Sequence, residues 1–251
     1  MPRSDIMEVK MKTKSIVKYY LYEIKSSIIG FYIIMLLGCI ATYVGYKLSG
    51  GELYSNGIEL ATIIFLFVLG LNLFRSQFNF LIQNGVTRKA NFIGFLVSTL
   101  VVVLFATIDS FISVIMHNLI GYESLYHMLY AGSSQGYGFM YIIKSILLLT
   151  AMYGVFYMIG YFITTLYYAM NKVMKIIVSV SVPAFFIIGL PIIDYFLNID
   201  INSGIEYIAL NMLGIYNENV SILNPIVSCL LIYTVLSALN YFVTRRISVK
   251  E

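Results

Sequence analysis

The stretch IIGFYIIMLLGCIATYVGYKL, residues 28–48, decides the fold class of this chain. Its first 19 residues contain no Asp, Glu, Lys or Arg. An α-helix rises about 1.5 Å per residue, so about 20 apolar residues cross the roughly 30 Å hydrocarbon core of a bilayer. The stretch therefore predicts a transmembrane helix.

Five further apolar stretches of comparable length follow. They cover approximately residues 58–74, 92–117, 139–168, 174–197 and 221–243. A membrane barrel would instead alternate apolar and polar residues in strands of about ten residues. We therefore predict an all-α membrane protein with six transmembrane helices, in one transmembrane domain over residues 1–251. Within it, residues 1–27 form an N-terminal cytoplasmic or interfacial segment, 28–243 the six-helix membrane domain and 244–251 a cytoplasmic tail.

The composition excludes a soluble domain. Hydrophobic residues make up 60% of the chain, charged residues 11%, and the mean hydropathy is +0.87. Soluble domains average about 45–50% apolar and about 25% charged residues. The net charge of +4 is scattered along membrane-flanking segments, which does not fit a nucleic-acid interface. Richness in Lys, Asn, Ile and Tyr is typical of an AT-rich genome, so we expect a multi-pass protein of a bacterial cell membrane.

The basic residues predict the orientation. Fourteen of the 16 Lys and Arg fall on one predicted face, which contains both chain ends. Lys47 is on the opposite face, and Lys144 lies within a span. Cytoplasmic loops carry an excess of Lys and Arg. Both termini are therefore predicted to be cytoplasmic. Six acidic residues are assigned to the external face: Glu52, Glu59, Glu123, Asp200, Glu206 and Glu218.

The segment before the first span has a helical amphipathic pattern. At 100° per residue, one arc contains Ile16, Val17, Tyr20, Leu21 and Ile24, and the other side contains Lys14, Lys18, Tyr22 and Lys25. Such a helix lies in the membrane interface with its lysines toward anionic headgroups. We expect it to turn into the first span near Ser26-Ser27. A basic flank that only fixes orientation is a compatible alternative.

The loop between the second and third spans predicts a short amphipathic helix. Phe78, Leu81 and Ile82 have i, i+3, i+4 spacing. Asn84-Gly85 ends the helix, and Thr87 can cap the third span. Held between two spans, exposed apolar residues there would form a docking element for a cytoplasmic partner. An ordinary basic loop lying on headgroups is the alternative.

The segment QNGVTRKANFIGFL, residues 83–96, resembles the sequence that enters the third span of ABC-2 type transporter permeases. The six-span layout, with an interfacial N-terminal helix and a short apolar excursion (residues 204–214) before the last span, is similar too. The resemblance implies a cytoplasmic coupling helix that docks on a separate ATP-binding subunit. The matching contact residues are Phe78, Leu81, Ile82, Gln83, Asn84, Gly85, Val86, Thr87, Arg88 and Lys89.

The same resemblance implies the partners and the cargo. A second permease subunit, identical or related, would complete the transporter, and ATP and Mg would bind to the partner subunit. The lack of a large external domain resembles compact exporters of amphipathic peptides, antimicrobials, drugs or lipid-like molecules. A non-transporting immunity or sensor subunit of a membrane complex remains the alternative.

Three charged residues lie at similar depth within predicted spans: Asp109, Lys144 and Asp194. A charge at that depth is costly unless it is paired or hydrated. We expect Lys144 to pair with Asp109 or Asp194, either as a structural ion pair or as part of a path for a cationic substrate. Pro183 and Pro191 are expected to kink the fifth span.

Sequence motifs of catalysis are missing. The chain has neither a Gly-x-x-x-x-Gly-Lys-Ser/Thr loop nor a His-Glu-x-x-His motif, and His117 and His127 are far from metal-ligand spacing. Cys39 and Cys229 lie inside apolar runs, as small hydrophobic residues do. We therefore expect no enzyme activity and no bound cofactor or metal in this chain.

Overall fold

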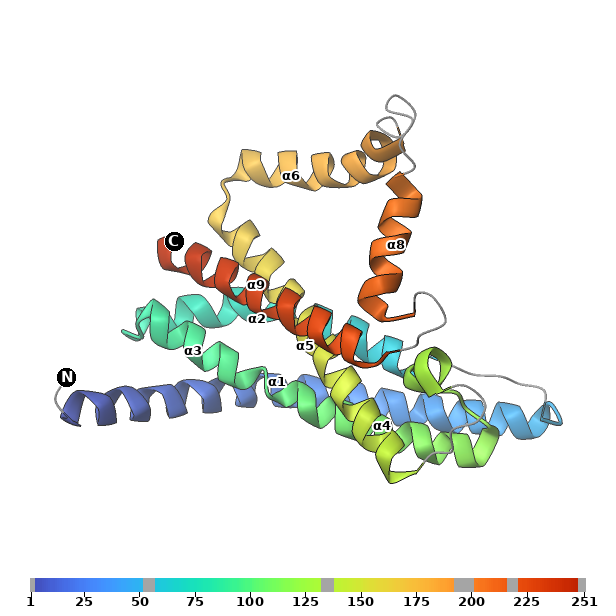
Figure 1. Ribbon diagram of the computed structural model, residues 1–251. Coiled ribbons are helices and arrows are strands. Elements are labelled where there is room, and N and C mark those ends of the chain that lie inside the picture. The colour runs from blue at the N-terminus through green and yellow to red at the C-terminus, as the bar shows by residue number, and fades with distance from the viewer. Residues whose placement is uncertain (1–2, 52–56, 132–137, 192–200, 216–220, 248–251) are drawn as a thin grey trace.

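The computed structural model describes residues 3–51, 57–131, 138–191, 201–215 and 221–247, and every regular element in them is helical. The elements, in chain order, are α1 (Arg3–Leu48), α2 (Ile58–Gln83), α3 (Arg88–Ser98), α4 (Val101–Ile120), the π-helix η1 (His127–Ala131), α5 (Phe139–Ala169), α6 (Lys172–Ala184), the π-helix η2 (Phe185–Gly189), α8 (Ile201–Leu213) and α9 (Leu223–Arg246) (Figure 1).

Five helical stretches are long and apolar enough to cross a membrane: Lys14–Leu48, Ile58–Gln83, Arg88–Ile120, Phe139–Ala169 and Leu223–Arg246. This confirms a multi-pass helical membrane protein. The predicted span 174–197 corresponds to α6, η2 and residues beyond Pro191, and residues 192–200 lie outside the described part of the chain. Pro183 lies inside α6, and η2 begins two residues later, consistent with a local change of helical hydrogen bonding after a proline.

Helix α1 corrects one prediction. It continues without a break from Arg3 to Leu48, so the turn expected near Ser26-Ser27 is not formed. Two serines do not stop a helix when its apolar arc has a protein partner. Ile16, Tyr20 and Ile24 are buried, and Ile16 packs directly on Gly94 of α3. This part of the arc therefore contacts the protein instead of lipid, and the opposite side with Lys14, Lys18, Tyr22 and Lys25 is exposed, as predicted.

Helices α2 and α5 form the most extensive helix pair. Their backbones touch at two glycines. A methyl group on Gly70 would overlap the carbonyl oxygen of Tyr157, and one on Gly160 would overlap the carbonyl oxygen of Phe67. Small residues allow such close approach in membranes, where packing rather than hydrophobic burial holds helices together.

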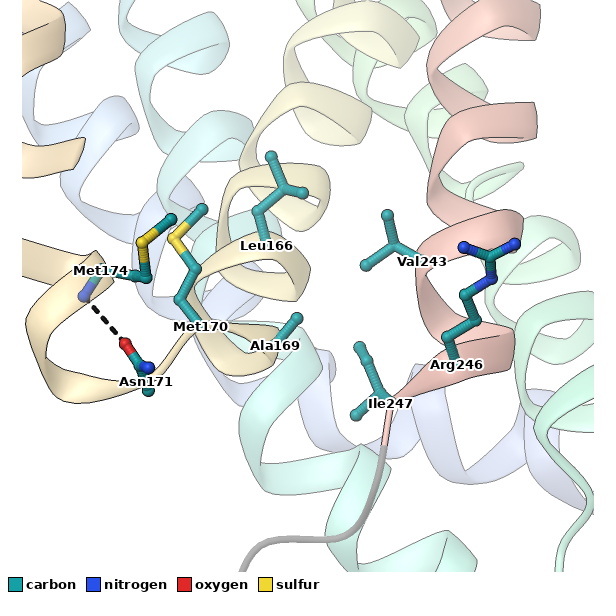
Figure 2. A pocket seen from close by; sticks show the side chains of 8 residues that line it. All are labelled: Leu166, Ala169, Met170, Asn171, Met174, Val243, Arg246 and Ile247. Atoms are coloured by element: carbon teal, nitrogen blue, oxygen red, sulfur yellow. Dashed lines mark hydrogen bonds between the residues drawn. The ribbon is translucent and has the colours of Figure 1, made fainter. Parts of the chain in front are cut away.

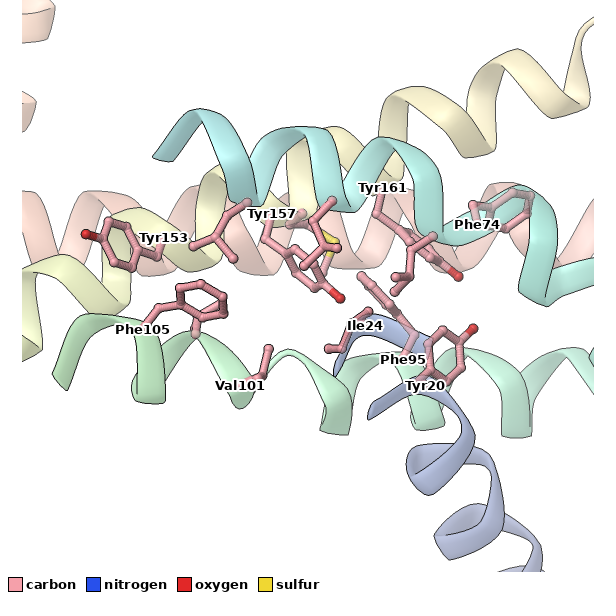
Figure 3. Packing of buried hydrophobic residues seen from close by; sticks show 14 of the residues in the cluster. Tyr20, Ile24, Phe74, Phe95, Val101, Phe105, Tyr153, Tyr157 and Tyr161 are labelled. Carbon is pink, nitrogen blue, oxygen red and sulfur yellow. The ribbon is translucent and has the colours of Figure 1, made fainter. Parts of the chain in front are cut away.

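Aromatic side chains fill the core around this contact (Figure 3). Phe95 of α3 stacks on Tyr161 of α5, with ring centroids 3.5 Å apart. Tyr20 brings α1 into the same cluster, where its hydroxyl donates to Oδ1 of Asn91 at 2.7 Å. The core thus joins α1, α2, α3 and α5.

The two ends of the bundle contain different parts of the chain. Figure 1 shows the N-terminus, the α2–α3 turn and the end of α9 at one end. A hydrogen bond confirms part of this arrangement, because Nη1 of Arg88 donates to the carbonyl oxygen of Arg245 at 3.3 Å. This end carries Arg88, Lys89, Arg245 and Arg246, and we call it the basic end.

Replacing Gly160 with alanine should lower the free energy of unfolding by about 2 kcal/mol, because the added methyl overpacks a backbone contact. Gly38→Ala is the matched control, since nothing lies within 4 Å of a Cβ placed there. Unfolding of both variants in detergent micelles measures the difference. Equal stability of the two variants would contradict the close α2–α5 contact.

Candidate functional site

The turn between α2 and α3 has the geometry of a rigid elbow, defined here as Gln83–Lys89. After α2, the N–H groups of Gly85 and Val86 donate to the carbonyl oxygens of Ile82 and Leu81, each at 3.0 Å. Gly85 has φ +77°, a left-handed conformation that glycine adopts at no steric cost. Thr87 then caps α3 and accepts the Ala90 N–H at 3.2 Å. The predicted helix end and cap are both confirmed.

The predicted separate coupling helix is not formed. Phe78, Leu81 and Ile82 are the last turns of α2, which continues to Gln83. Phe78 and Leu81 are buried, and Ile82 is half-buried. The Phe78 ring stacks on Phe74 at 4.8 Å. The first two residues therefore hold α2 in the core and cannot form an exposed apolar docking face.

The rest of the predicted contact set lies at the tip of the elbow. Its exposed residues are Gln83, Asn84, Gly85, Thr87, Arg88 and Lys89, and Val86 is half-buried. The available surface is therefore polar and basic. Three contacts with remote segments hold the elbow and the end of α2 in place. Arg88 donates to the carbonyl oxygen of Arg245, and the Tyr168 hydroxyl donates to Oδ1 of Asn79 at 2.7 Å. The rings of Tyr19 and Phe80 stack with their centroids 5.0 Å apart.

Two cavities open at the basic end, and one of them is lined in part by the elbow. One, of about 430 Å³, is lined by Ser15, Ile16, Tyr19, Phe80, Leu81, Asn84, Gly85 and Val86. The other, of about 540 Å³, lies between the α5–α6 junction and the end of α9, and Figure 2 shows its lining residues Leu166, Ala169, Met170, Asn171, Met174, Val243, Arg246 and Ile247. Asn171 caps α6 there by accepting the Met174 N–H at 2.9 Å. The cavity beside the elbow could receive a side chain of a partner.

Asp109, the first of the predicted intramembrane charges, is fully buried on α4. Its carboxylate accepts hydrogen bonds from Tyr153 at 2.6 Å and from Tyr32 at 3.3 Å. Lys144 lies half-buried on the neighbouring α5, but among the described residues no ion pair joins it to Asp109. Tyrosine hydroxyls take the place of the expected lysine. Asp194 lies outside the described residues.

A second buried carboxylate, Glu59, was assigned to the external face by the sequence analysis. It lies in the first turn of α2 with 1% exposure. Ser113 donates to its Oε1 at 2.8 Å, and Tyr122 donates to its Oε2 at 2.6 Å. The sequence signal that could have found it is the position of Glu59 directly at the start of an apolar stretch, where a helix N-terminus stabilises a carboxylate.

Tyr122 connects two parts of the chain at the start of α2. Its hydroxyl oxygen accepts the N–H groups of Gly57 and Ile58 at 3.1 and 2.9 Å while it donates to Glu59. Burial, with the neighbouring Glu59 carboxylate as the second cause, raises the pKa of Tyr122 far above its ordinary value. The hydroxyl therefore stays protonated and remains a donor. It attaches the start of α2 to the chain that follows α4.

Comparison with protein-family models, with curated proteins and with solved structures gave no match to this chain.

Replacing Tyr122 with phenylalanine should lower the free energy of unfolding by roughly 2 kcal/mol, because it removes the hydroxyl that pairs with Oε2 of the buried Glu59 and with two backbone N–H groups. Tyr22→Phe, at a side chain with 75% exposure, should change it by less than about 0.5 kcal/mol. Denaturant unfolding in micelles compares the two. If Tyr122→Phe is as stable as Tyr22→Phe, the connecting role of Tyr122 is wrong.

Proposed function

We propose that this chain is the membrane subunit of an ATP-driven exporter in a bacterial cell membrane. Its elbow contacts a separate cytoplasmic subunit that binds ATP and Mg. The observation that carries the proposal is the coincidence of the permease-like segment 83–96 with a rigid, exposed, basic turn. The chain itself supplies no ATPase activity, and the energy for transport comes from the partner.

The continuity of α2 supports mechanical coupling through the bundle. Its 26 residues extend about 39 Å from the elbow to Glu59 and Tyr122. Because α2 is one helix that touches α5 backbone to backbone, a push on the elbow displaces α2 and α5 together. The displacement reaches the Glu59–Tyr122 hydrogen bond at the other end. Closure of the ATP-binding subunits would thus be transmitted to the external end.

The predicted fifth span, which begins with α6, and a second permease subunit belong to the same proposal. No residue of α6 is buried, and its apolar residues Val173, Ile176 and Val180 are more than half exposed. Figure 1 shows α6 lying apart from the core helices. A surface of this kind is compatible with an identical or related second subunit. The basic end would face the cytoplasm, in agreement with the excess of Lys and Arg there.

Asp109 is not accessible to a cargo molecule within a single subunit. Its carboxylate is enclosed by tyrosine hydroxyls and has no exposed surface. We therefore assign Asp109 a structural role and place the path of an amphipathic peptide, drug or lipid-like substrate between two permease subunits.

Gly85→Pro and Arg88→Glu should each abolish stimulation of the ATPase partner while membrane insertion is retained. Proline fixes φ near −65°, which is incompatible with +77° at Gly85. Glutamate at position 88 reverses the charge of the tip and removes the donor to Arg245. ATP hydrolysis by the copurified complex in proteoliposomes measures the effect.

Lys25→Glu is the control for charge reversal away from the elbow, because Lys25 is exposed on α1 and lies outside the elbow. It should leave stimulation unchanged. Wild-type stimulation in both elbow variants would refute the docking role of the elbow.

A further inference from the structure

A shallow groove runs between α1 and α4 toward the end of the bundle opposite the basic end. Its volume is about 240 Å³. The lining residues are Leu36, Cys39, Ile40 and Tyr43 on α1 and Ile112, Ile115, Met116 and Leu119 on α4. Both helical stretches belong to the candidate membrane spans. The groove therefore opens to the hydrocarbon region of the bilayer.

The residues at the bottom of the groove are buried, and those at its opening are exposed. Met116 is 4% exposed and packs in a cluster with Ile120 and Tyr122. By contrast, Ile40 is 59% and Ile115 57% exposed. An unfilled recess loses the dispersion contacts of its lining atoms. A flexible hydrocarbon chain in the groove restores these contacts.

A basic side chain, Lys47, lies at the end of the groove. Leu36, Ile40, Tyr43 and Lys47 follow one another at spacings of four, three and four residues, which places them on one face of α1. The Nζ of Lys47 lies 5.7 Å from the centroid of the Tyr43 ring. Within the described residues no carboxylate forms an ion pair with Lys47. Lys47 is exposed, so its ammonium group can contact an anion at the mouth of the groove.

The distances match one leaflet of a bilayer. From Leu36 to Lys47 the helix rises about 16 Å. Half of a hydrocarbon core is about 15 Å thick. When Lys47 lies at the headgroup level, the groove therefore runs along the acyl chains of the same leaflet.

We propose that the α1–α4 groove binds one singly anionic glycerophospholipid. One acyl chain fills the groove over Leu36, Ile40 and Ile115, and the headgroup phosphate contacts the Lys47 ammonium. The lipid fills the recess between the outer part of α1 and α4, where α1 has few protein neighbours. The site does not depend on the exporter function.

Photolabelling of the full-length chain tests the site. The purified protein is equilibrated with phosphatidylglycerol that carries a diazirine on its acyl chain, irradiated and mapped by mass spectrometry. Label should appear on the groove residues of α1 and α4, and phosphatidylcholine with the same diazirine should label them less. Lys47→Ala should reduce phosphatidylglycerol labelling about five-fold, the effect of one basic residue at a membrane surface, and Lys47→Arg should restore it.

Two matched controls separate the groove from the rest of α1. Ile40→Trp fills the groove and should remove the label, whereas Ile34→Trp, at a site with 72% exposure on the opposite face, should not. Lys25→Ala removes one exposed charge of α1 outside the groove and should have no effect. Lys47 is itself exposed, so its replacement tests headgroup binding without disturbing the core.

Two results would overturn the proposal. Equal labelling by both lipids, unchanged in Lys47→Ala, would mean that the groove holds only bulk lipid. Absence of label together with a Cys39–Cys39 disulfide dimer on mild oxidation would mean that a second copy of the chain covers the groove.

Discussion

The backbone contact between Gly70 of α2 and Gly160 of α5 is the constraint on which the rest of the structure depends. Lipid tails are as apolar as the side chains of a span, so apolar surface alone does not bring two helices together in a bilayer. Close approach does, because it brings many backbone and side-chain atoms into contact. At one end of α2 this packing fixes the elbow, and at the other it positions Glu59 beside Ser113 and Tyr122.

Tyrosines provide most of the polar partners inside the bundle. Asp109, Glu59 and Asn91 all accept hydrogen bonds from tyrosine hydroxyls, and the rings of those tyrosines pack as apolar residues do. A hydroxyl donor satisfies a buried carboxylate without bringing a second charge into the membrane, where charges are costly. This explains why Asp109 is enclosed without Lys144.

The sequence was informative where a single segment determines its own structure. Helix α2 begins at Ile58 and α5 at Phe139, as the hydropathy pattern predicted, because each start is marked by the change from a polar, Gly- and Ser-containing stretch to an apolar run. The turn at Gly85 and the cap at Thr87 were also predictable, because their geometry depends on local residue type.

Features that need a remote partner were missed. An apolar pattern shows that Phe78 and Ile16 avoid water, but it cannot distinguish lipid from α5 or α3 as the neighbour. The uninterrupted α1 and the tyrosine partners of Asp109 were missed for the same reason, because both depend on contacts with remote parts of the chain.

The central claim is that the elbow transmits force from a separate nucleotide-hydrolysing subunit. A photoreactive amino acid at position 83, which is exposed at the tip, tests this most directly in intact cells. The account predicts a cross-link to an ATP-binding protein from position 83 and none from position 48, an exposed residue at the opposite end of the bundle. The account would be contradicted if position 83 cross-linked only to proteins that bind no nucleotide. Labelling of that position from outside by a membrane-impermeant reagent would also contradict the account.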